Sequence, residues 1–321
     1  MDHPLLEISD LTVALRRDGG EVFPVRGLRL RVERSETLCL VGESGSGKSL
    51  TALAVMGLLP PVCRVAAGSI RLDGTELIPL PQDTMRSIRG RRMAMVFQEP
   101  MTALNPLFTV GNQVAEAMTA HGVKAKVAAA RAIDLLSETG VHDPARVAAS
   151  FPHQLSGGLR QRAVIAMALA NSPSLLLADE PTTALDVTVA AKILALMVNL
   201  KKSRGMGVLL ITHDFGVVAA VADRVAVMYA GQVVEAGDKA AILEAPRHPY
   251  TRALIDALPG RAGIARGSML KSIPGTVPDL SLVGAGCRFA PRCRFAAPEC
   301  VAAEPPPVEA AGRMYRCIRP L

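Results

Sequence analysis

Apolar and charged residues alternate near the start of the chain. Leu28, Leu30 and Val32 are separated by Arg29 and Arg31. This alternation is typical of a strand with one buried face and one solvated face. We therefore expect an antiparallel β region over about residues 5 to 35.

Runs that are almost wholly apolar follow this region. Leu38–Val41 is the first, and a strand without an alternating polar face suits a parallel sheet covered on both sides. Helical patterns separate it from four similar runs, and this order predicts an α/β core with crossover helices. The later runs are Met93–Phe97, Leu175–Ala178, Val208–Thr212 and Val225–Met228.

Between about residues 105 and 172 the sequence carries no strand pattern. Apolar residues recur there at helical spacing, which predicts a helical subdomain inserted into the core. These residues are Val110, Val114, Ala117, Met118, Ile133, Leu135 and Leu136.

Pro and Gly interrupt every longer pattern after residue 258. We therefore predict one large domain over residues 1–258 and a separate, irregular C-terminal module over residues 259–321. The interruptions are Pro259-Gly260, Ile273-Pro274-Gly275, Val277-Pro278 and Pro305-Pro306-Pro307.

The composition narrows the classes of ligand. The net charge of +7 over 321 residues suits nucleic acid, anionic lipid or nucleotide phosphates. We expect no nucleic acid, because the Arg residues are scattered and only 3% of the residues are aromatic, too few for base-stacking platforms.

The sequence also bears on location. No apolar stretch approaches the roughly 20 residues that cross a bilayer. The start, Met1-Asp2-His3-Pro4, lacks the basic and apolar regions of a signal peptide. We therefore expect the protein to stay in the cytoplasm.

A glycine-rich segment directly follows the strand predicted at Leu38–Val41. It reads Gly42-Glu43-Ser44-Gly45-Ser46-Gly47-Lys48-Ser49 and fits the P-loop pattern G-x-x-x-x-G-K-[ST] before a helical stretch. In such a loop the backbone around Gly42, Ser44, Gly45 and Gly47 turns its N–H groups toward phosphate oxygens. Lys48 would reach the terminal phosphates and Ser49 would ligate Mg²⁺. The alternative is a glycine-rich turn without a ligand.

Two carboxylates end the apolar strand that begins at Leu175. Parallel-sheet geometry places Asp179 and Glu180 at the same sheet edge as the P-loop. Asp179 suits Mg²⁺ coordination, and Glu180 suits polarisation of the water that attacks the γ-phosphate of ATP. Alternatively, this pair caps a helix, since Pro181-Thr182 follows.

The segment Leu155-Ser156-Gly157-Gly158-Leu159-Arg160-Gln161-Arg162 is similar to the LSGGQ signature of ABC ATPases. Ser156 can cap the following helix, and Gly157 and Gly158 leave its N–H groups open to phosphate. Resemblance to this family implies a RecA-like core with an antiparallel β subdomain and a helical subdomain. It also implies that the signature faces ATP held by a partner domain. Leu159-Arg160 departs from the consensus.

Three single residues stand where this family has functional ones. By resemblance, Gln98 touches Mg²⁺ and the attacking water, Asp186 communicates across the dimer, and His213 contacts the γ-phosphate. Each taken alone would be an ordinary polar residue at a strand end. For the adenine-stacking side chain, spacing from the first strand indicates Leu15. Phe23 is a substitute that could equally belong to the core.

Three further segments are Phe97–Pro106, Phe151–Leu155 and His248-Pro249-Tyr250-Thr251. They resemble the oligopeptide/dipeptide (peptide/nickel) importer branch, in its first-ATPase type. This resemblance implies a peripheral protein on the cytoplasmic face of the inner membrane that hydrolyses ATP to energise import of di- or oligopeptides. Its implied partners are a second ATPase subunit, two permeases and an extracytoplasmic solute-binding protein. Alternatives are a soluble ABC ATPase and an importer of nickel chelates or glutathione.

Four of the six cysteines cluster near the C-terminus, with five, six and sixteen residues between them. Free thiols, zinc and an iron–sulfur cluster are compatible with a cytoplasmic chain. Zinc sites more often use shorter hairpins, and resemblance to the importer branch implies a [4Fe–4S] cluster. Arg288, Arg292 and Arg294 would then offset its negative charge. The cysteines are Cys287, Cys293, Cys300 and Cys317.

Overall fold

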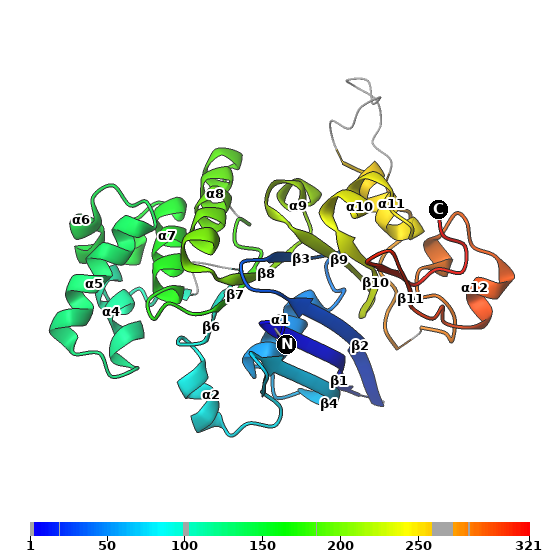
Figure 1. Ribbon diagram of the computed structural model, residues 1–321, viewed down its shortest axis with the longest axis horizontal. Helices are drawn as coiled ribbons and strands as arrows, with labels where there is room; N and C mark the ends of the chain where they lie inside the picture. The colour runs from blue at the N-terminus through cyan, green and yellow to red at the C-terminus, as the bar shows by residue number, and fades with distance from the viewer. Residues whose placement is uncertain (1–2, 19, 99–102, 184, 259–271, 282) are drawn as a thin grey trace. The chain divides into compact units, whose positions relative to one another are not determined.

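The computed structural model describes six stretches of the chain (Figure 1). The chain separates into two compact units. The described stretches are residues 3–18, 20–98, 103–183, 185–258, 272–281 and 283–321. Unit 1 comprises Met1–Leu6, Val32–Glu36 and Leu72–Leu210, and unit 2 comprises Glu7–Arg31, Thr37–Arg71 and Ile211–Leu321. The break expected at Pro259-Gly260 lies outside the described residues.

Long strands near the N-terminus form a sheet in unit 2, as the alternating pattern predicts. In β1 the apolar side chains of Ile8, Leu11 and Val13 are buried, whereas most of the intervening residues are partly or fully exposed. The strands of unit 2 in this sheet lie in the order β2, β1, β4. Their bounds are β1 (Leu6–Arg17), β2 (Gly20–Val32) and β4 (Cys63–Leu72).

A second group of strands in unit 2 has the order β3, β9, β10, β12, β11. Strand β3 is buried throughout and runs parallel to β9, with Val41 opposite Val227. Strand β10 is antiparallel to β9 and to β12. The bounds are β3 (Thr37–Val41), β9 (Arg224–Tyr229), β10 (Gln232–Asp238), β11 (Val308–Ala310) and β12 (Arg313–Tyr315).

Short helices complete unit 2. The P-loop leads into α1, and α9 follows β8, the strand in which the chain passes from unit 1 to unit 2. The helices are α1 (Lys48–Met56), α9 (Phe215–Val221), α10 (Lys239–Glu244), α11 (Pro249–Asp256) and α12 (Pro298–Ala302), with a 3₁₀ turn, η2 (Ala290–Arg292).

Unit 1 combines parallel strands with the predicted helical insertion. Met93 of β6 lies opposite Leu175 of β7 in a parallel pair, and β8 is the other neighbour of β7. The bounds are β5 (Thr75–Glu76), α2 (Gln82–Ile88), β6 (Met93–Val96), β7 (Leu175–Asp179), α8 (Val187–Arg204) and β8 (Gly207–Thr212).

The helices of the insertion lie together in Figure 1 and bury most of the expected apolar stripe, except that Ala117 is only half-buried and Ile133 is exposed. Ile133 is 38% exposed. It falls beside the buried stripe formed by Ala128, Ala132, Leu135 and Leu136 of α5 rather than on it. The helices are α4 (Val110–Thr119), α5 (Ala125–Glu138), α6 (Pro144–Ala149), η1 (Pro152–Gln154) and α7 (Gly157–Ala168).

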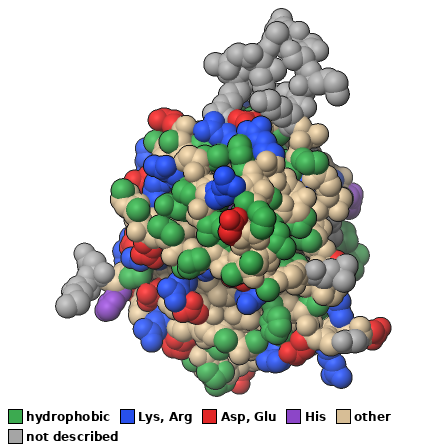
Figure 2. Space-filling view, turned by 90° about the vertical axis from the view of Figure 1, so that its right-hand side faces the viewer, with side chains coloured by type: hydrophobic (Ala, Val, Ile, Leu, Met, Phe, Trp, Pro, Cys, Tyr) green, Lys and Arg blue, Asp and Glu red, His purple; other side chains and the backbone are tan. Residues whose placement is uncertain are grey.

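The surface and the helices bear on the expected ligands and location. On the face shown in Figure 2, basic side chains are dispersed among acidic and apolar ones rather than gathered into one broad patch. Among the described residues, none of the helices combines the length and the apolar character needed to cross a membrane.

A buried carboxylate ties the C-terminal strands to the rest of unit 2. Glu235 in β10 is fully buried. One of its oxygens accepts hydrogen bonds from the Arg313 guanidinium (2.7 Å) and from the Arg247 N–H (2.7 Å), and the other accepts one from the His248 N–H (3.0 Å). Because a buried charge is costly without partners, these bonds fix β12 and the start of α11 against β10.

His248 is the cap of α11 and is only 1% exposed. Its Nδ1 accepts a hydrogen bond from the Tyr250 N–H at 3.1 Å, so the ring is neutral with its proton on Nε2. Burial lowers the pKa of His248 from 6.5 to about 4, although a hydrogen bond to the backbone of Arg316 acts in the opposite direction. The His248-Pro249-Tyr250-Thr251 motif therefore has a structural role in capping α11.

The buried imidazole predicts an acid-sensitive fold. Between pH 6.5 and about 4 the unfolded chain binds a proton at His248 that the folded chain does not. The contribution of His248 is therefore complete above pH 6.5, and about 3 kcal/mol of it is lost as the pH falls toward 4. Replacement by Asn keeps a capping acceptor that does not titrate. Thus His248→Asn should flatten the decline of unfolding free energy over this range, measured by denaturant titration.

The control for this measurement is His142→Gln, a change at an exposed histidine of unit 1. It should retain the decline of the unmodified protein. Equal slopes for His248→Asn and the unmodified protein would show that His248 does not carry this pH dependence.

Candidate functional site

The P-loop of unit 2 packs so closely that two of its positions exclude any side chain. A Cβ at Gly42 would lie 2.1 Å from the Met228 carbonyl oxygen, and one at Gly47 would lie 2.3 Å from the Pro24 carbonyl oxygen. Gly47 also has a φ of 102°, which favours glycine. The loop is thus confined by β9 on one side and β2 on the other.

Lys48, the first residue of α1, turns back into the loop. Its side chain is buried, and Nζ donates to the carbonyl oxygens of Gly42 (2.7 Å) and Glu43 (2.9 Å). No side chain caps the N-terminus of α1, so its first N–H groups and the ammonium group together favour an anion. Ser44 and Gly45 are exposed, and Ser49 is half-buried. This arrangement suits phosphate binding.

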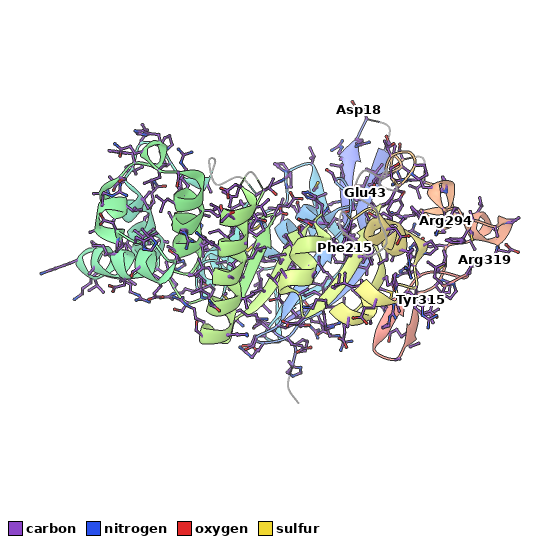
Figure 3. The ribbon with its side chains drawn as sticks, turned by 90° about the horizontal axis from the view of Figure 1, so that it is seen from above. Asp18, Glu43, Phe215, Arg294, Tyr315 and Arg319 are labelled. Carbon is purple, nitrogen blue, oxygen red and sulfur yellow. The ribbon has the colours of Figure 1, made fainter. Side chains whose placement is uncertain are left out.

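Glu43 is held by residues that the sequence motif does not include. Its N–H donates to Tyr250 Oη at 2.9 Å. Its carboxylate, labelled in Figure 3, accepts two hydrogen bonds from the Arg292 guanidinium, at 2.7 and 2.9 Å. The only signal in the sequence was the presence of Tyr250 in a motif noted for its resemblance to the importer branch.

In unit 1 the structure brings Gln98 and Glu180 together. Glu180 directly follows β7 with a φ of 46°, and Glu180 Oε2 accepts hydrogen bonds from Gln98 Nε2 (3.1 Å) and Thr183 Oγ1 (2.9 Å). Asp179, the last residue of β7, is 5% exposed. Helix α8 begins only at Val187, so this carboxylate pair does not cap it.

The signature segment is a helix start in unit 1. Ser156 caps α7 as expected, with its Oγ accepting from the Leu159 N–H at 3.4 Å. A Cβ at Gly158 would lie 2.8 Å from Val189 Cγ1 of α8. Asp186 caps α8 by accepting from the Val189 N–H at 2.9 Å. The starts of α7 and α8 therefore pack together, with Ser156 and Gly157 exposed.

The other predicted residues lie on or directly after strands. His213 is exposed directly after β8, and the next residue, Asp214, caps α9. Phe23 on β2 is 39% exposed, so it does not belong to the core, whereas Leu15 on β1 is half-buried. Residues 99–102 of the Phe97–Pro106 segment and Ala184 beside Asp186 lie outside the described residues.

All four C-terminal cysteines line one small cavity of about 20 Å³ in unit 2, together with Phe289 and Phe295. None forms a disulfide. Burial raises the pKa of three of the thiols. Within the described stretches, no group of three or more His, Cys, Asp or Glu side chains is arranged to hold a metal ion. The thiols with raised pKa are those of Cys287, Cys293 and Cys317.

The three arginines expected to offset a cluster charge have other contacts. Arg292 pairs with Glu43, Arg288 donates to the Ala230 carbonyl oxygen, and Arg294 stacks 4.7 Å from the Phe295 ring centroid. The expectation that Arg292 serves the cysteines is therefore wrong, because its charge is already neutralised by the P-loop carboxylate.

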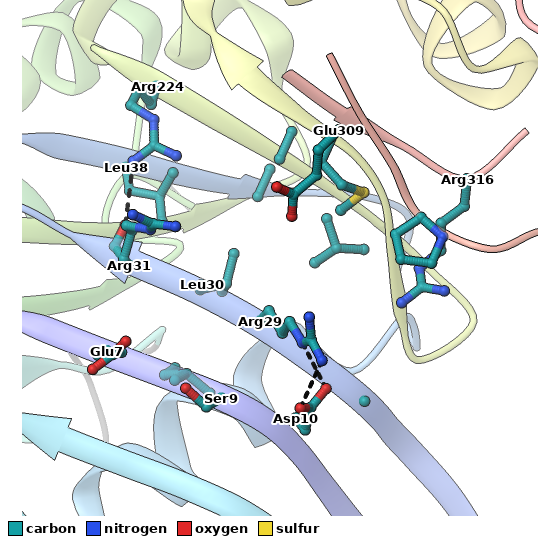
Figure 4. A pocket seen from close by; sticks show the side chains of 17 residues that line it. Glu7, Ser9, Asp10, Arg29, Leu30, Arg31, Leu38, Arg224, Glu309 and Arg316 are labelled. Atoms are coloured by element: carbon teal, nitrogen blue, oxygen red, sulfur yellow. Dashed lines mark hydrogen bonds and ion pairs between the residues drawn. The ribbon is translucent and has the colours of Figure 1, made fainter. Parts of the chain in front are cut away.

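A separate cavity of about 320 Å³ lies in unit 2 away from the P-loop (Figure 4). Its lining carries four arginines and three carboxylates, of which Arg29 and Asp10 pair with each other. Arg29 makes a two-bond contact with Asp10 at 2.7 and 2.8 Å, which lowers the pKa of Asp10. No residue of Gly42–Ser49 lines it. The P-loop therefore remains the better candidate site.

Two families match the chain in the order that the sequence motifs predict. Residues 25–183 match the family described as ABC transporter. Residues 234–300 match the family described as oligopeptide/dipeptide transporter, C-terminal region.

Curated relatives extend these matches to nearly the whole chain. The chain is 50% identical over 319 residues to the oligopeptide transport ATP-binding protein OppD of Mycobacterium tuberculosis, an alignment that covers 98% of this chain and 52% of that protein. It is 48% identical over 330 residues to a putative peptide import ATP-binding protein of Brucella melitensis, covering 98% and 97%. The chain thus spans about half the length of the mycobacterial relative.

Solved structures agree with the family assignment. The ATP-binding cassette MJ0796, in a dimeric post-hydrolysis state bound to ADP and Pi, is similar with a TM-score of 0.66 and 28% identity, covering 73% of this chain and 98% of that chain. The cbiO1 protein of Clostridium perfringens, part of the ABC transporter complex cbiONQ, has a TM-score of 0.64 and 25% identity, covering 74% and 90%.

The predicted fold class and the predicted ATPase family are both confirmed. The solved neighbours are ABC cassettes, and the family matches include the P-loop and the carboxylate strand. The chain therefore belongs to the ABC transporter family, among the ATP-binding subunits that carry the oligopeptide/dipeptide transporter C-terminal region.

Proposed function

We propose that this chain hydrolyses ATP to energise the import of di- or oligopeptides, or of related small solutes, across the cytoplasmic membrane. The relatives described as peptide import and oligopeptide transport ATP-binding proteins support a peptide cargo. The observation that carries the hydrolytic part is the Glu180 carboxylate, held by Gln98 and Thr183 directly after the strand that ends in Asp179.

The proposed roles follow the chemistry of each side chain. Lys48 and the loop N–H groups bind the phosphates, and Ser49, Asp179 and Gln98 hold Mg²⁺, which neutralises phosphate charge when bound. Glu180 orients the attacking water, and His213 contacts the γ-phosphate. The exposed ring of Phe23 favours it over Leu15 for stacking on adenine.

The role of Glu180 predicts a variant that binds ATP without cleaving it. Glu180→Gln keeps the side-chain shape but removes the carboxylate, so hydrolysis should fall by at least about 100-fold. ATP affinity should be nearly unchanged. The measurement is phosphate release by the assembled transporter with the partner's site disabled, and nucleotide titration reports affinity. The control, Glu116→Gln, changes an exposed residue of α4. Undiminished hydrolysis by Glu180→Gln would remove Glu180 from this role.

A second ATPase subunit would complete the site. Ser156 and Gly157 are exposed at the start of α7, which leaves its N–H groups accessible to a nucleotide on another domain. The chain has a single P-loop, so we propose a heterodimer in which Ser156, Gly157, Gly158 and Asp186 face the partner's nucleotide.

This composite site predicts that the isolated chain is a poor ATPase. Assembly with the second ATPase and the permeases should raise kcat at least about tenfold, since each site gains the signature helix of the other domain. Steady-state hydrolysis by the purified chain and by the complex, compared per P-loop, checks this. Equal rates would contradict the composite site.

We propose two permeases and an extracytoplasmic solute-binding protein as the remaining partners, with the chain on the cytoplasmic face of the inner membrane. Three apolar side chains of unit 1 are exposed close to Gln98 in sequence, and exposed apolar groups of this kind favour a protein contact. Recovery of the chain without membrane subunits would instead identify a soluble ABC ATPase. A receptor loaded with a nickel chelate or glutathione would change the cargo. The exposed residues are Phe97 (41%), Leu107 (78%) and Phe108 (52%).

We also propose that the four C-terminal cysteines hold a [4Fe–4S] cluster. Their thiols line one apolar cavity, and a cluster takes one thiolate on each of four irons, so its ligands stand farther apart than those of a single ion. The cavity of about 20 Å³ has room for about one water molecule, so the thiols must move outward to admit a cluster. Because burial raises the pKa of three of them, loading would release protons and be favoured at higher pH.

Anaerobic purification should therefore give a brown protein whose broad absorbance at about 400 nm bleaches on reduction. Cys300→Ser should lose iron and colour. Cys63→Ser, a change on β4 outside the cavity, should retain both. A colourless anaerobic preparation with stoichiometric zinc and no iron by elemental analysis would rule out the cluster without affecting the ATPase assignment.

A further inference from the structure

Glu43, the second residue of the P-loop, is fixed at each of its polar groups by other parts of unit 2. Its N–H donates to Tyr250 Oη, and its carboxylate pairs with Arg292. Its carbonyl oxygen accepts from Lys48 Nζ at 2.9 Å and from the Ser46 N–H at 3.3 Å. The position of Glu43 therefore helps to place the lysine ammonium, which also donates to the Gly42 carbonyl oxygen.

Arg292 is well suited to hold Glu43. Its side chain is only 6% exposed, whereas that of Glu43 is 28% exposed. Besides its two bonds to the carboxylate, the guanidinium donates to Tyr229 Oη (3.3 Å) and to the carbonyl oxygens of Pro274 (2.8 Å) and Gly275 (3.3 Å). These five bonds match the five donors of an Arg side chain, so its orientation is fully specified.

The charge of Glu43 matters as well as its position. The carboxylate lies on a loop whose Lys48 and N–H groups are arranged to attract an anion, and an unpaired carboxylate there would repel phosphate. The two-bond contact with Arg292 neutralises it. Arg292 thus both holds the loop and cancels a charge that opposes the ligand.

We propose that Arg292 is a positioning residue for nucleotide binding, through which the C-terminal segment sets the P-loop in its phosphate-binding form. Arg292 acts through Glu43 and has no proposed contact with the nucleotide. This inference rests on the proposed phosphate-binding role of the P-loop.

The test is a double-mutant cycle of the unmodified chain, Arg292→Gln, Glu43→Gln and the double variant, read out as the Kd for ATP by titration of a fluorescent ATP analogue on the full chain. Arg292→Gln leaves the Glu43 carboxylate unpaired, so the Kd should rise about tenfold. Arg292→Lys keeps the charge without the two-bond geometry, so it should give a smaller rise. The control Arg294→Gln alters an exposed neighbour (Figure 3) and should leave the Kd unchanged.

The double variant separates positioning and charge cancellation from a general loss of structure. Removing the Glu43 carboxylate as well removes the repulsion, so Glu43→Gln with Arg292→Gln should bind ATP more tightly than Arg292→Gln alone. A merely structural role would leave the double variant no better. Thermal unfolding without nucleotide reports any loss of folding, and if Arg292→Gln does not fold, Arg292→Lys and its combination with Glu43→Gln complete the same cycle.

Two results would overturn the inference. One is an unchanged Kd for ATP in Arg292→Gln, provided that the positive control Lys48→Ala binds ATP more weakly than the unmodified chain. The other is a double variant no better than Arg292→Gln. If Lys48→Ala itself binds ATP as the unmodified chain does, the phosphate-binding role of the loop falls, and the role of Arg292 falls with it.

Discussion

The structure around the P-loop depends on the contact of three backbones with no side chain between them. A Cβ on Gly42 would clash with the Met228 carbonyl oxygen, and a Cβ on Gly47 would clash with the Pro24 carbonyl oxygen. Strand β9, the start of β2 and the loop can therefore meet only because two glycines are present. Once the loop is confined in this way, the Lys48 ammonium has two backbone carbonyls within reach. The placement of the Lys48 ammonium therefore depends on this backbone packing.

Local sequence patterns predicted the strands and helices whose buried positions form one regular pattern. Strand β3 is buried at all five positions, and its apolar run identified it. Strand β4 was not predicted, because only Ile70 and Leu72 are buried among its ten residues. Strand β10 was missed for another reason. It contains Glu235, a fully buried carboxylate, and its partner Arg313 is 78 residues away. A charge whose partner is that distant resembles a surface residue when the sequence is considered alone.

The residues of the candidate site also divide into those that local sequence predicts and those that only the structure reveals. The P-loop, the carboxylate strand and the signature segment are contiguous motifs, so the sequence alone was enough to select their residues as candidates. Gln98 was selected by resemblance, and its hydrogen bond to Glu180 was found only in the structure. Arg292 could not be assigned in this way. The sequence analysis noted it only as a possible counter-charge for the cysteines, since nothing local indicates a carboxylate 249 residues earlier. Tyr250 was noted within a motif, but its hydrogen bond to Glu43 needed the fold. Contacts that join distant segments are therefore the part of the site that requires a structure.

The separation between Glu43 and Arg292 also affects how the protein is made. Chains emerge from the ribosome N-terminus first, at about 5–20 residues per second. The two partners are separated by 249 positions, so the chain from Glu43 to Arg292 takes about 12 to 50 s to synthesise. During that interval the nascent chain contains the whole P-loop motif but not the ion pair that neutralises its carboxylate. A chain cut short before residue 292 would remain in that condition permanently. The P-loop with its carboxylate neutralised therefore exists only after residue 292 has been synthesised, although the sequence motif is present much earlier.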